Sequence, residues 1–154
     1  MQASLDMSYC GPAPLPDDLW GQWNFDPWLI GLLALVSLVF FLRPAALLQR
    51  QAFAAGMTML ALIFISPLCA LFSARVVHHV LLVALAAPLF ALAIHWQRHR
   101  LATLLAPLTA IHTVLFWLWH APDPYQIALA NIPVYWLMQV TLLGSATMLW
   151  SAIF

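Results

Sequence analysis

The chain has 154 residues, of which 65% are hydrophobic and 6% are charged, and its mean hydropathy is +0.94. Soluble domains carry about 25% charged residues, so this composition excludes an ordinary soluble domain. The formal charges are five arginines and five aspartates, with no lysine and no glutamate. They leave charge-free windows of roughly the length that spans a bilayer at 27–42, 51–74, 76–97, 101–122 and 124–154.

These windows predict helices, because the even alternation of barrel strands is absent and a helix satisfies its own backbone in lipid. The expected fold is therefore all-α, a polytopic membrane helix bundle. Residues 1–26 are expected to form an external N-terminal arm, and residues 27–154 the transmembrane bundle. The five expected helices cover about 27–47, 51–71, 75–96, 100–120 and 132–154.

Prolines and capping residues indicate where these helices begin, bend and end. Asp26 can cap the first helix, and Pro27 suits its first position. Pro67 is expected to weaken the last turn of the second helix, and Pro88 and Pro107 to bend the third and fourth. Residues 73–75 are expected to form a short external turn, which makes the second and third helices an antiparallel hairpin.

The distribution of charge predicts the orientation. If the N-terminus is outside, the external segments hold all the acids: Asp6, Asp17, Asp18, Asp26 and Asp123. Four of the five arginines then lie inside: Arg43, Arg50, Arg98 and Arg100. The positive-inside rule therefore favours N-out and C-in.

Arg75 is the exception, because it lies at the outer end of two hydrophobic windows. An arginine there opposes the topology signal and is costly to insert, which makes it a functional candidate with Asp123, or otherwise Asp26, as its expected partner. The alternative is an interfacial arginine that extends to lipid phosphates.

Histidines are the main polar residues in the expected spans. His79, His112 and His120 fall within the outer zone of the third and fourth helices, where imidazoles suit copper, haem iron or proton transfer. Hydrogen bonds to backbone carbonyls or water at an interface are the alternative for each. His95 and His99 belong instead to a basic internal loop.

Several other functions lack the residues that they need. There is no Ser-His-Asp arrangement, no glycine-rich phosphate loop and no intramembrane carboxylate pair, so we expect no enzyme activity. Cys10 and Cys69 have neither disulfide nor zinc spacing. The methionines within the spans could bind Cu(I), although filling gaps in the packing is the simpler role: Met57, Met59, Met138 and Met148.

Motifs along the chain resemble those of the polytopic CtaG-like cytochrome c oxidase assembly proteins. The matching stretches are Trp23-Asn24-Phe25-Asp26-Pro27, Ser66-Pro67-Leu68, 72–82 with its paired His78 and His79, Ala86-Ala87-Pro88-Leu89, His112, Trp117-Leu118-Trp119-His120-Ala121-Pro122, and Tyr125 with Ala128-Leu129. The family pattern has a histidine at the position of Arg75, and two histidines and a glutamate at those of Tyr135, Gln139 and Met138.

The resemblance implies a membrane-embedded factor for cytochrome c oxidase assembly in the bacterial inner membrane, which handles copper at the outer face. Its metal ligands would be His79, His112 and His120, with Arg75, His78, Asp123 and Tyr125 as further functional candidates. The expected partners are subunits of cytochrome c oxidase or another respiratory complex and membrane lipids, with no nucleic acid.

Two alternatives stay open. The chain could be a non-catalytic accessory subunit of a respiratory haem-copper oxidase, in which the same histidines serve only structure. It could also be a haem-binding membrane cytochrome, for which His79 with His112 is the one plausible ligand pair.

Overall fold

The computed structural model describes residues 9, 15, 17–67, 72–94 and 103–154, with the backbone alone for 72–76. Its described part is helical and contains no strand, as the sequence predicts. The elements are η1 (Leu19–Gly21), α1 (Pro27–Phe41), α2 (Leu47–Ile65), α3 (Phe72–Leu81), η3 (Leu82–Ala86), α4 (Ala87–Ile94), α6 (Leu105–His120), α7 (Pro122–Ala130) and α8 (Ile132–Ile153). Here η1 is a 3₁₀ turn, and η3 is a π-helical segment that joins α3 to α4.

Three helical stretches in the described residues are long and apolar enough to cross a membrane. They are Leu47–Ile65, Val77–Ile94 and Ile132–Ile153. Helix α1 is also apolar but has 15 residues. The composition-based prediction of a membrane helix bundle therefore agrees with the structure at this level.

The first two helices end earlier than predicted, in each case near a proline. Helix α1 begins at Pro27, where the Asp26 carboxylate accepts from the backbone N–H of Trp28 at 2.9 Å, but it ends at Phe41. Pro44 follows within one turn and disfavours helical geometry in the residue before it. Helix α2 ends at Ile65 for the same reason, because Ser66, which precedes Pro67, is extended.

The third predicted helix contains a π-helical segment where the sequence suggested a bend. Within η3 the N–H of Ala87 donates to the carbonyl of Leu82, five residues earlier. The same spacing would pair residue 88 with Val83, but Pro88 has no N–H. The indole N–H of Trp150 donates to the Val83 carbonyl instead, at 2.9 Å. Helix α8 thus supplies the hydrogen bond that the proline removes.

The loop expected at 120–131 is largely the short helix α7. Pro122 and Pro124 lie in its first turn, where backbone N–H groups need no intrahelical partner, so neither proline interrupts it. Pro107 likewise lies in the first turn of α6 and does not bend the helix interior. Residues 73–75, predicted as a turn, belong to α3.

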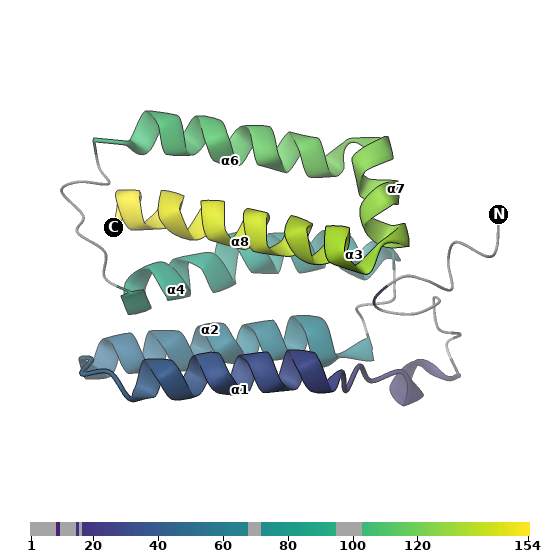
Figure 1. Ribbon diagram of the computed structural model, residues 1–154, viewed down its shortest axis with the longest axis horizontal. Helices are drawn as coiled ribbons and strands as arrows, with labels where there is room; N and C mark the ends of the chain where they lie inside the picture. The colour runs from purple at the N-terminus through teal and green to yellow at the C-terminus, as the bar shows by residue number, and fades with distance from the viewer. Residues whose placement is uncertain (1–8, 10–14, 16, 68–71, 95–102) are drawn as a thin grey trace.

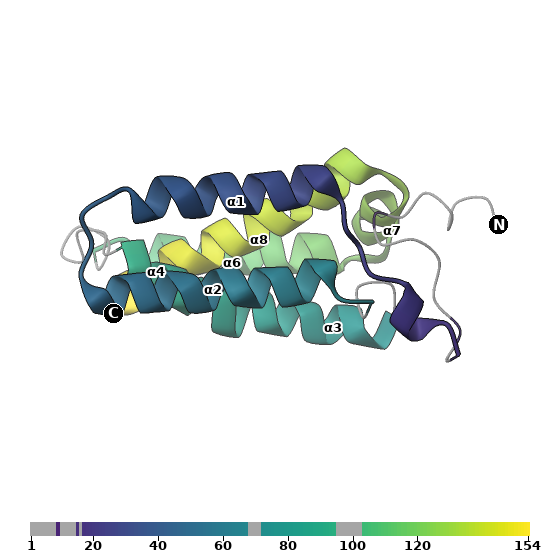
Figure 2. The ribbon, with the colours of Figure 1, turned by 90° about the horizontal axis from the view of Figure 1, so that it is seen from below.

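The bundle is arranged around α8 (Figure 1). One side of α8 contacts α4 and η3, and another contacts α6 and α7. Helix α2 packs on α4 and η3, and α1 packs on α2, as the perpendicular view shows (Figure 2). Helix α7 and residues 17–26 lie at one end of the bundle, and the α1–α2 connection and the C-terminus lie at the other (Figure 1).

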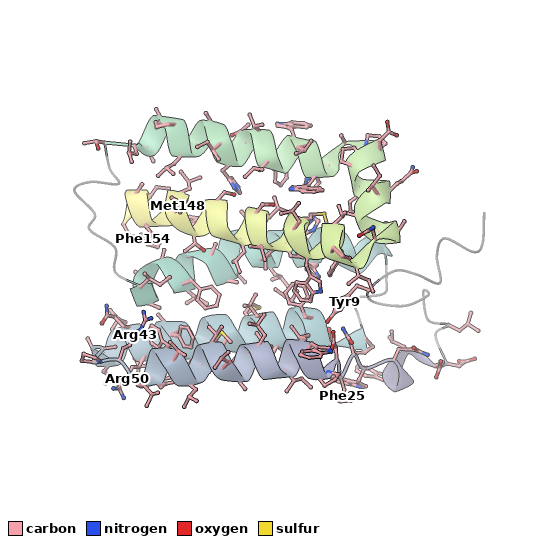
Figure 3. The ribbon with its side chains drawn as sticks, viewed as in Figure 1. Tyr9, Phe25, Arg43, Arg50, Met148 and Phe154 are labelled. Atoms are coloured by element: carbon pink, nitrogen blue, oxygen red, sulfur yellow. The ribbon has the colours of Figure 1, made fainter. Side chains whose placement is uncertain are left out.

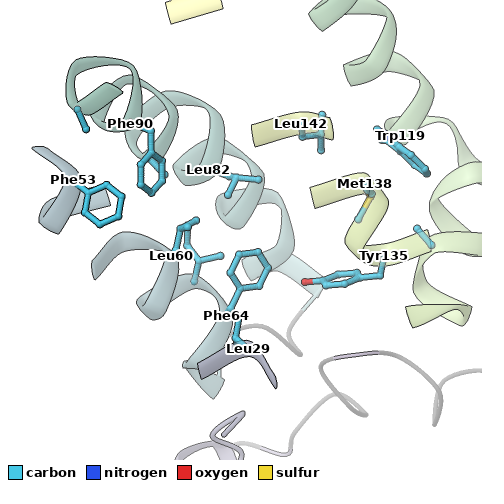
Figure 4. Packing of buried hydrophobic residues seen from close by; sticks show 14 of the residues in the cluster. Leu29, Phe53, Leu60, Phe64, Leu82, Phe90, Trp119, Tyr135, Met138 and Leu142 are labelled. Carbon is cyan, nitrogen blue, oxygen red and sulfur yellow. The ribbon is translucent and has the colours of Figure 1, made fainter. Parts of the chain in front are cut away.

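The core follows the length of the bundle between α2, the α3–α4 helix and α8 (Figure 4). Its largest fully buried side chains are Leu82, Met138 and Leu142. Toward the C-terminal end, the ring of Phe53 stacks on Phe40 with 3.8 Å between centroids and meets Phe90 edge-on at 5.8 Å. These rings connect α1 to α2 and α2 to α4.

Candidate metal site

Two of the predicted ligands, His79 and His120, lie side by side although they come from different helices. Their ring centroids are 5.3 Å apart in an edge-on arrangement. His79 lies on α3 and is 6% exposed, whereas His120 is the last residue of α6 and is exposed. The pair therefore consists of a buried imidazole next to an exposed one and lies at the α7 end of the bundle.

The hydrogen bond of His120 determines which of its nitrogens can act as a ligand. Its Nδ1–H donates to the carbonyl of Phe116 at 2.7 Å, and its ring stacks on the Phe116 ring with 4.0 Å between centroids. A carbonyl can only accept, so Nδ1 carries the proton and Nε2 of the neutral ring keeps its lone pair. Such a bond to the second nitrogen is how metal-binding histidines are commonly oriented.

His78 lies next to this pair but is held by α8. Its Nε2–H donates to the Oε1 of Gln139 at 3.3 Å, and its ring meets Phe64 edge-on at 5.0 Å and His79 at 5.5 Å. Both His78 and Gln139 are buried. His78 therefore connects α3 to α2 through Phe64 and to α8 through Gln139.

A cavity of about 10 Å³ lies among these side chains. Its lining consists of His78, His79, Tyr125, Leu129, Tyr135, Met138 and Gln139. The space is close to the minimum for one water molecule, so it could admit a single ion and not a haem. This cavity is therefore too small for a haem, and the haem alternative stays a prediction.

His112 occupies a different place. It lies eight residues before His120, which is about 12 Å along the helix axis. Its Nδ1–H donates to the hydroxyl of Ser145 at 2.9 Å, and that hydroxyl donates to the Leu142 carbonyl at 3.3 Å. Across 9, 15, 17–67, 72–94 and 103–154, no three His, Cys, Asp or Glu side chains are grouped to hold a metal ion. His79 and His120 are thus brought together without His112.

The other candidates differ in their relation to the pair. Tyr125, on α7, lines the cavity beside His79. Asp123 lies in the first turn of the same helix and is exposed. The side chain of Arg75 lies outside the described residues, as do His95, His99, Cys10 and Cys69, so its pairing with Asp123 or Asp26 stays a prediction.

The sequence indicated the histidines but not the surface of α8 that faces them. Tyr135, Met138, Gln139 and Leu142 follow the i, i+3, i+4, i+7 spacing of one helix face, and all four are buried. That spacing was the available signal that they adjoin the histidine pair.

Tyr9, from the N-terminal arm, covers this end of the bundle and was not predicted from the sequence. Its ring stacks on Tyr135 at 5.3 Å and meets Trp136 edge-on at 4.9 Å, and its hydroxyl donates to Asp26 at 2.7 Å. That bond lowers the pKa of Asp26, whereas burial and the nearby carboxylate raise the pKa of Tyr9.

Asn24 ties the same arm to the end of α2. Its backbone N–H donates to the Ile65 carbonyl at 3.0 Å, and its side-chain amide donates to the Phe64 carbonyl at 3.2 Å. These carbonyls lack intrahelical partners because α2 ends at Ile65. The arm therefore completes the hydrogen bonding of the helix end beside the histidines.

Comparison with protein-family models, curated proteins and solved structures finds no match to this chain.

Proposed function

We propose that this chain is a multi-pass membrane factor in cytochrome c oxidase assembly that holds copper transiently, as Cu(I), between His79 and His120. The observation that carries the proposal is the pairing of these two imidazoles, with Nε2 of His120 left available by the bond from Nδ1 to Phe116. The resemblance of the surrounding motifs to the CtaG-like proteins supports the choice of copper and of the oxidase as partner.

The donor set suits a soft, low-coordinate metal. Imidazole is a good copper ligand, and thioethers favour Cu(I). The side chain of Met138 lines the cavity together with His79 and is 1% exposed. Two imidazoles with one adjacent thioether would make a site that binds copper weakly enough to pass it on.

The proposal places the histidine pair on the external side of a bacterial inner membrane, in a bundle of five crossings that is N-out and C-in. The distribution of charge supports this orientation. Four acids of the described part, Asp17, Asp18, Asp26 and Asp123, belong to the arm and to α7, whereas Arg43 and Arg50 lie at the opposite end of the bundle (Figure 3). The positive-inside rule favours a cytoplasmic location for the arginine end.

A direct test is a titration of the purified protein with Cu(I) in competition with a chromophoric chelator, under anaerobic conditions. We expect one Cu(I) per chain, and His79→Ala or His120→Ala should each weaken binding by about tenfold or more. His112→Ala is the matched control, because it removes the same side chain from a position bonded to Ser145 and should leave the affinity unchanged. Equal loss in all three variants would contradict a site built on the pair.

The second candidate function is the accessory subunit of a respiratory oxidase, which the bonds from His78 to Gln139 and from His112 to Ser145 favour. Histidines held in this way can serve packing alone. A protein that binds no Cu(I) but co-purifies with mature oxidase at fixed stoichiometry would establish this role and exclude the copper proposal.

A further inference from the structure

A groove lies on the side of the bundle away from α6, between α1, α2, α4 and α8. Its volume is about 470 Å³, and its lining is almost wholly apolar. Representative lining residues are Leu33 and Val36 from α1, Met57 and Leu60 from α2, and Leu143 and Met148 from α8. Only Leu29 of α1 is buried, so this helix covers the groove loosely.

The polar side chains of the lining are already bonded within the protein. Gln139 accepts from His78, and the Thr147 hydroxyl donates to the Leu143 carbonyl at 2.8 Å. Gly144 leaves additional space in the groove, because it has no side chain and an added Cβ would meet no atom within 4 Å. The groove therefore offers van der Waals contacts to an apolar ligand and few free groups for hydrogen bonds.

The dimensions favour an acyl chain over a helix. The lining residues of α8 run from Trp136 to Met148, about 18 Å along the helix, comparable to one leaflet of a hydrocarbon core of about 30 Å. A helix with side chains is about 10–12 Å wide, and a groove of this volume and length accommodates a single acyl chain more readily than a helix.

Charge at one end of the groove indicates an anionic head group. Arg50 lies one turn before Phe53, which lines the groove, and Arg43 lies just after the end of α1. Both are exposed, at the end of the bundle that also holds Met148 and Phe154 (Figure 3). The sequence has no acid between Asp26 and Asp123, so no carboxylate from the intervening helices can neutralise these arginines.

We propose that the groove binds one anionic phospholipid, with an acyl chain between α1 and α8 and the phosphate beside Arg43 and Arg50. Arginine suits this role, since its guanidinium binds phosphate in a bidentate manner and attracts anionic lipid. The lipid then fills the space that α1 leaves open and joins α1 to α8. This site is separate from the histidine pair and does not depend on the copper proposal.

The experiment uses the purified protein in phosphatidylcholine vesicles. The vesicles contain a small amount of phosphatidylglycerol spin-labelled on one acyl chain, and spin-labelled phosphatidylcholine serves as the reference. Electron paramagnetic resonance separates immobilised from bulk label. We expect a larger immobilised fraction for phosphatidylglycerol. Arg43→Gln and Arg50→Gln should each lower the preference for the anionic lipid about fivefold.

Two glycines provide a matched test of the acyl-chain position. Gly144→Leu should remove the specifically immobilised component, because its side chain enters the groove. Gly31→Leu, which adds the same side chain to α1 where a Cβ also meets nothing, should leave the component unchanged. Val140→Trp is a second variant that fills the groove if Gly144→Leu does not fold.

Three outcomes would overturn the proposal. The first is an immobilised fraction that is the same for both lipids and does not change with the arginine substitutions. The second is a spectrum that responds equally to the Gly31 and Gly144 variants. The third is release of a co-purifying membrane protein by Gly144→Leu with no change in the lipid spectrum, which would assign the groove to a partner helix.

Discussion

The two sides of α8 contrast in how they are filled. On its packed side, Tyr135, Met138, Leu142 and Ala146 are buried. On its groove side, Val140, Gly144 and Met148 are exposed and face open space beside α1. Both sides are apolar, so hydrophobicity does not explain why one is closed and the other is open.

Hydrogen bonds explain the difference better. On the packed side, the indole of Trp119 donates to the Thr141 hydroxyl at 3.0 Å, and Trp150 donates to the Val83 carbonyl. In lipid, apolar surface gains little from leaving the solvent, so close packing and interhelical hydrogen bonds determine which helices associate. The side-chain hydrogen bonds of α8 to other helices reach α3, η3 and α6, whereas the groove lies at its boundary with α1.

The largest effect is expected from truncating the packed side. Leu142 is completely buried, and Leu142→Ala should lower the free energy of unfolding by about 2–5 kcal/mol because it leaves a cavity in the core. Val140→Ala, on the groove side, should cost far less, since Val140 is 64% exposed. Denaturant unfolding in mixed micelles measures both, and equal losses would remove the distinction between the two sides.

The second test removes the bond that compensates for Pro88. Trp150→Phe leaves the Val83 carbonyl without the indole donor and should cost about 1 kcal/mol in the same assay. Trp117→Phe is the control, because it makes the same substitution at a side chain that is 69% exposed. If Pro88→Ala in the Trp150→Phe background restored no stability, the link between π-helical segment and indole would be wrong.

Adding one methyl group to a glycine should change stability differently at the packed α2–α4 contact and beside the groove. At Gly56 a Cβ would approach the Phe90 ring to 3.1 Å, so Gly56→Ala should gain little or lose stability by overpacking. At Gly144 the space is open, and Gly144→Ala should stabilise α8 by up to about 1 kcal/mol through helix propensity. Thermal unfolding of the two variants side by side would show whether the signs differ.

The smallest effect concerns Tyr9, which covers the first turn of α8 where the two sides meet. The lowered pKa of Asp26 means that its contribution is present above its ordinary pKa and is lost as pH falls through the lowered value. The raised pKa of Tyr9 means that its contribution is present below the ordinary tyrosine pKa and is lost as pH rises through the raised value. The contact should therefore persist throughout the neutral range.

Tyrosinate absorbance can check this expectation. The difference between wild type and Tyr9→Phe should show Tyr9 ionising above its ordinary pKa of 10.0, and Asp26→Asn should move that ionisation to lower pH. Ionisation of Tyr9 at its ordinary pKa would show that the ring does not occupy the site over Tyr135 and Trp136.

Much of the helix pattern could be predicted, and the errors share a cause. The charge-free windows located the helices, and the start at Pro27 and the range 132–153 agree closely with the structure. The errors at Phe41, Ile65 and α7 arise at prolines. Proline ends a helix that precedes it but fits the first turn of one that follows, and hydrophobicity cannot distinguish the two.

The sequence predicted the depth of the histidines in the bundle but not the directions of their side chains. Helical rise placed His79, His112 and His120 in one outer zone, because residue number along a helix fixes height. The direction in which a side chain points depends on the packed partner, and here α6 turns His120 toward His79 while Ser145 of α8 binds His112. Tyr9 could not be predicted, since its partners Asp26 and Tyr135 are distant in sequence.

By itself, the sequence determined that this chain is helical and suited to a membrane, because composition and the length of apolar windows act locally and need no partner. The tertiary structure decided which side of α8 is closed, which histidines meet and where a groove remains. These depend on side chains from separate helices, such as Trp150 meeting the carbonyl that Pro88 leaves without a backbone donor. Hydrogen bonds and close contacts of this kind form only once the helices are packed together.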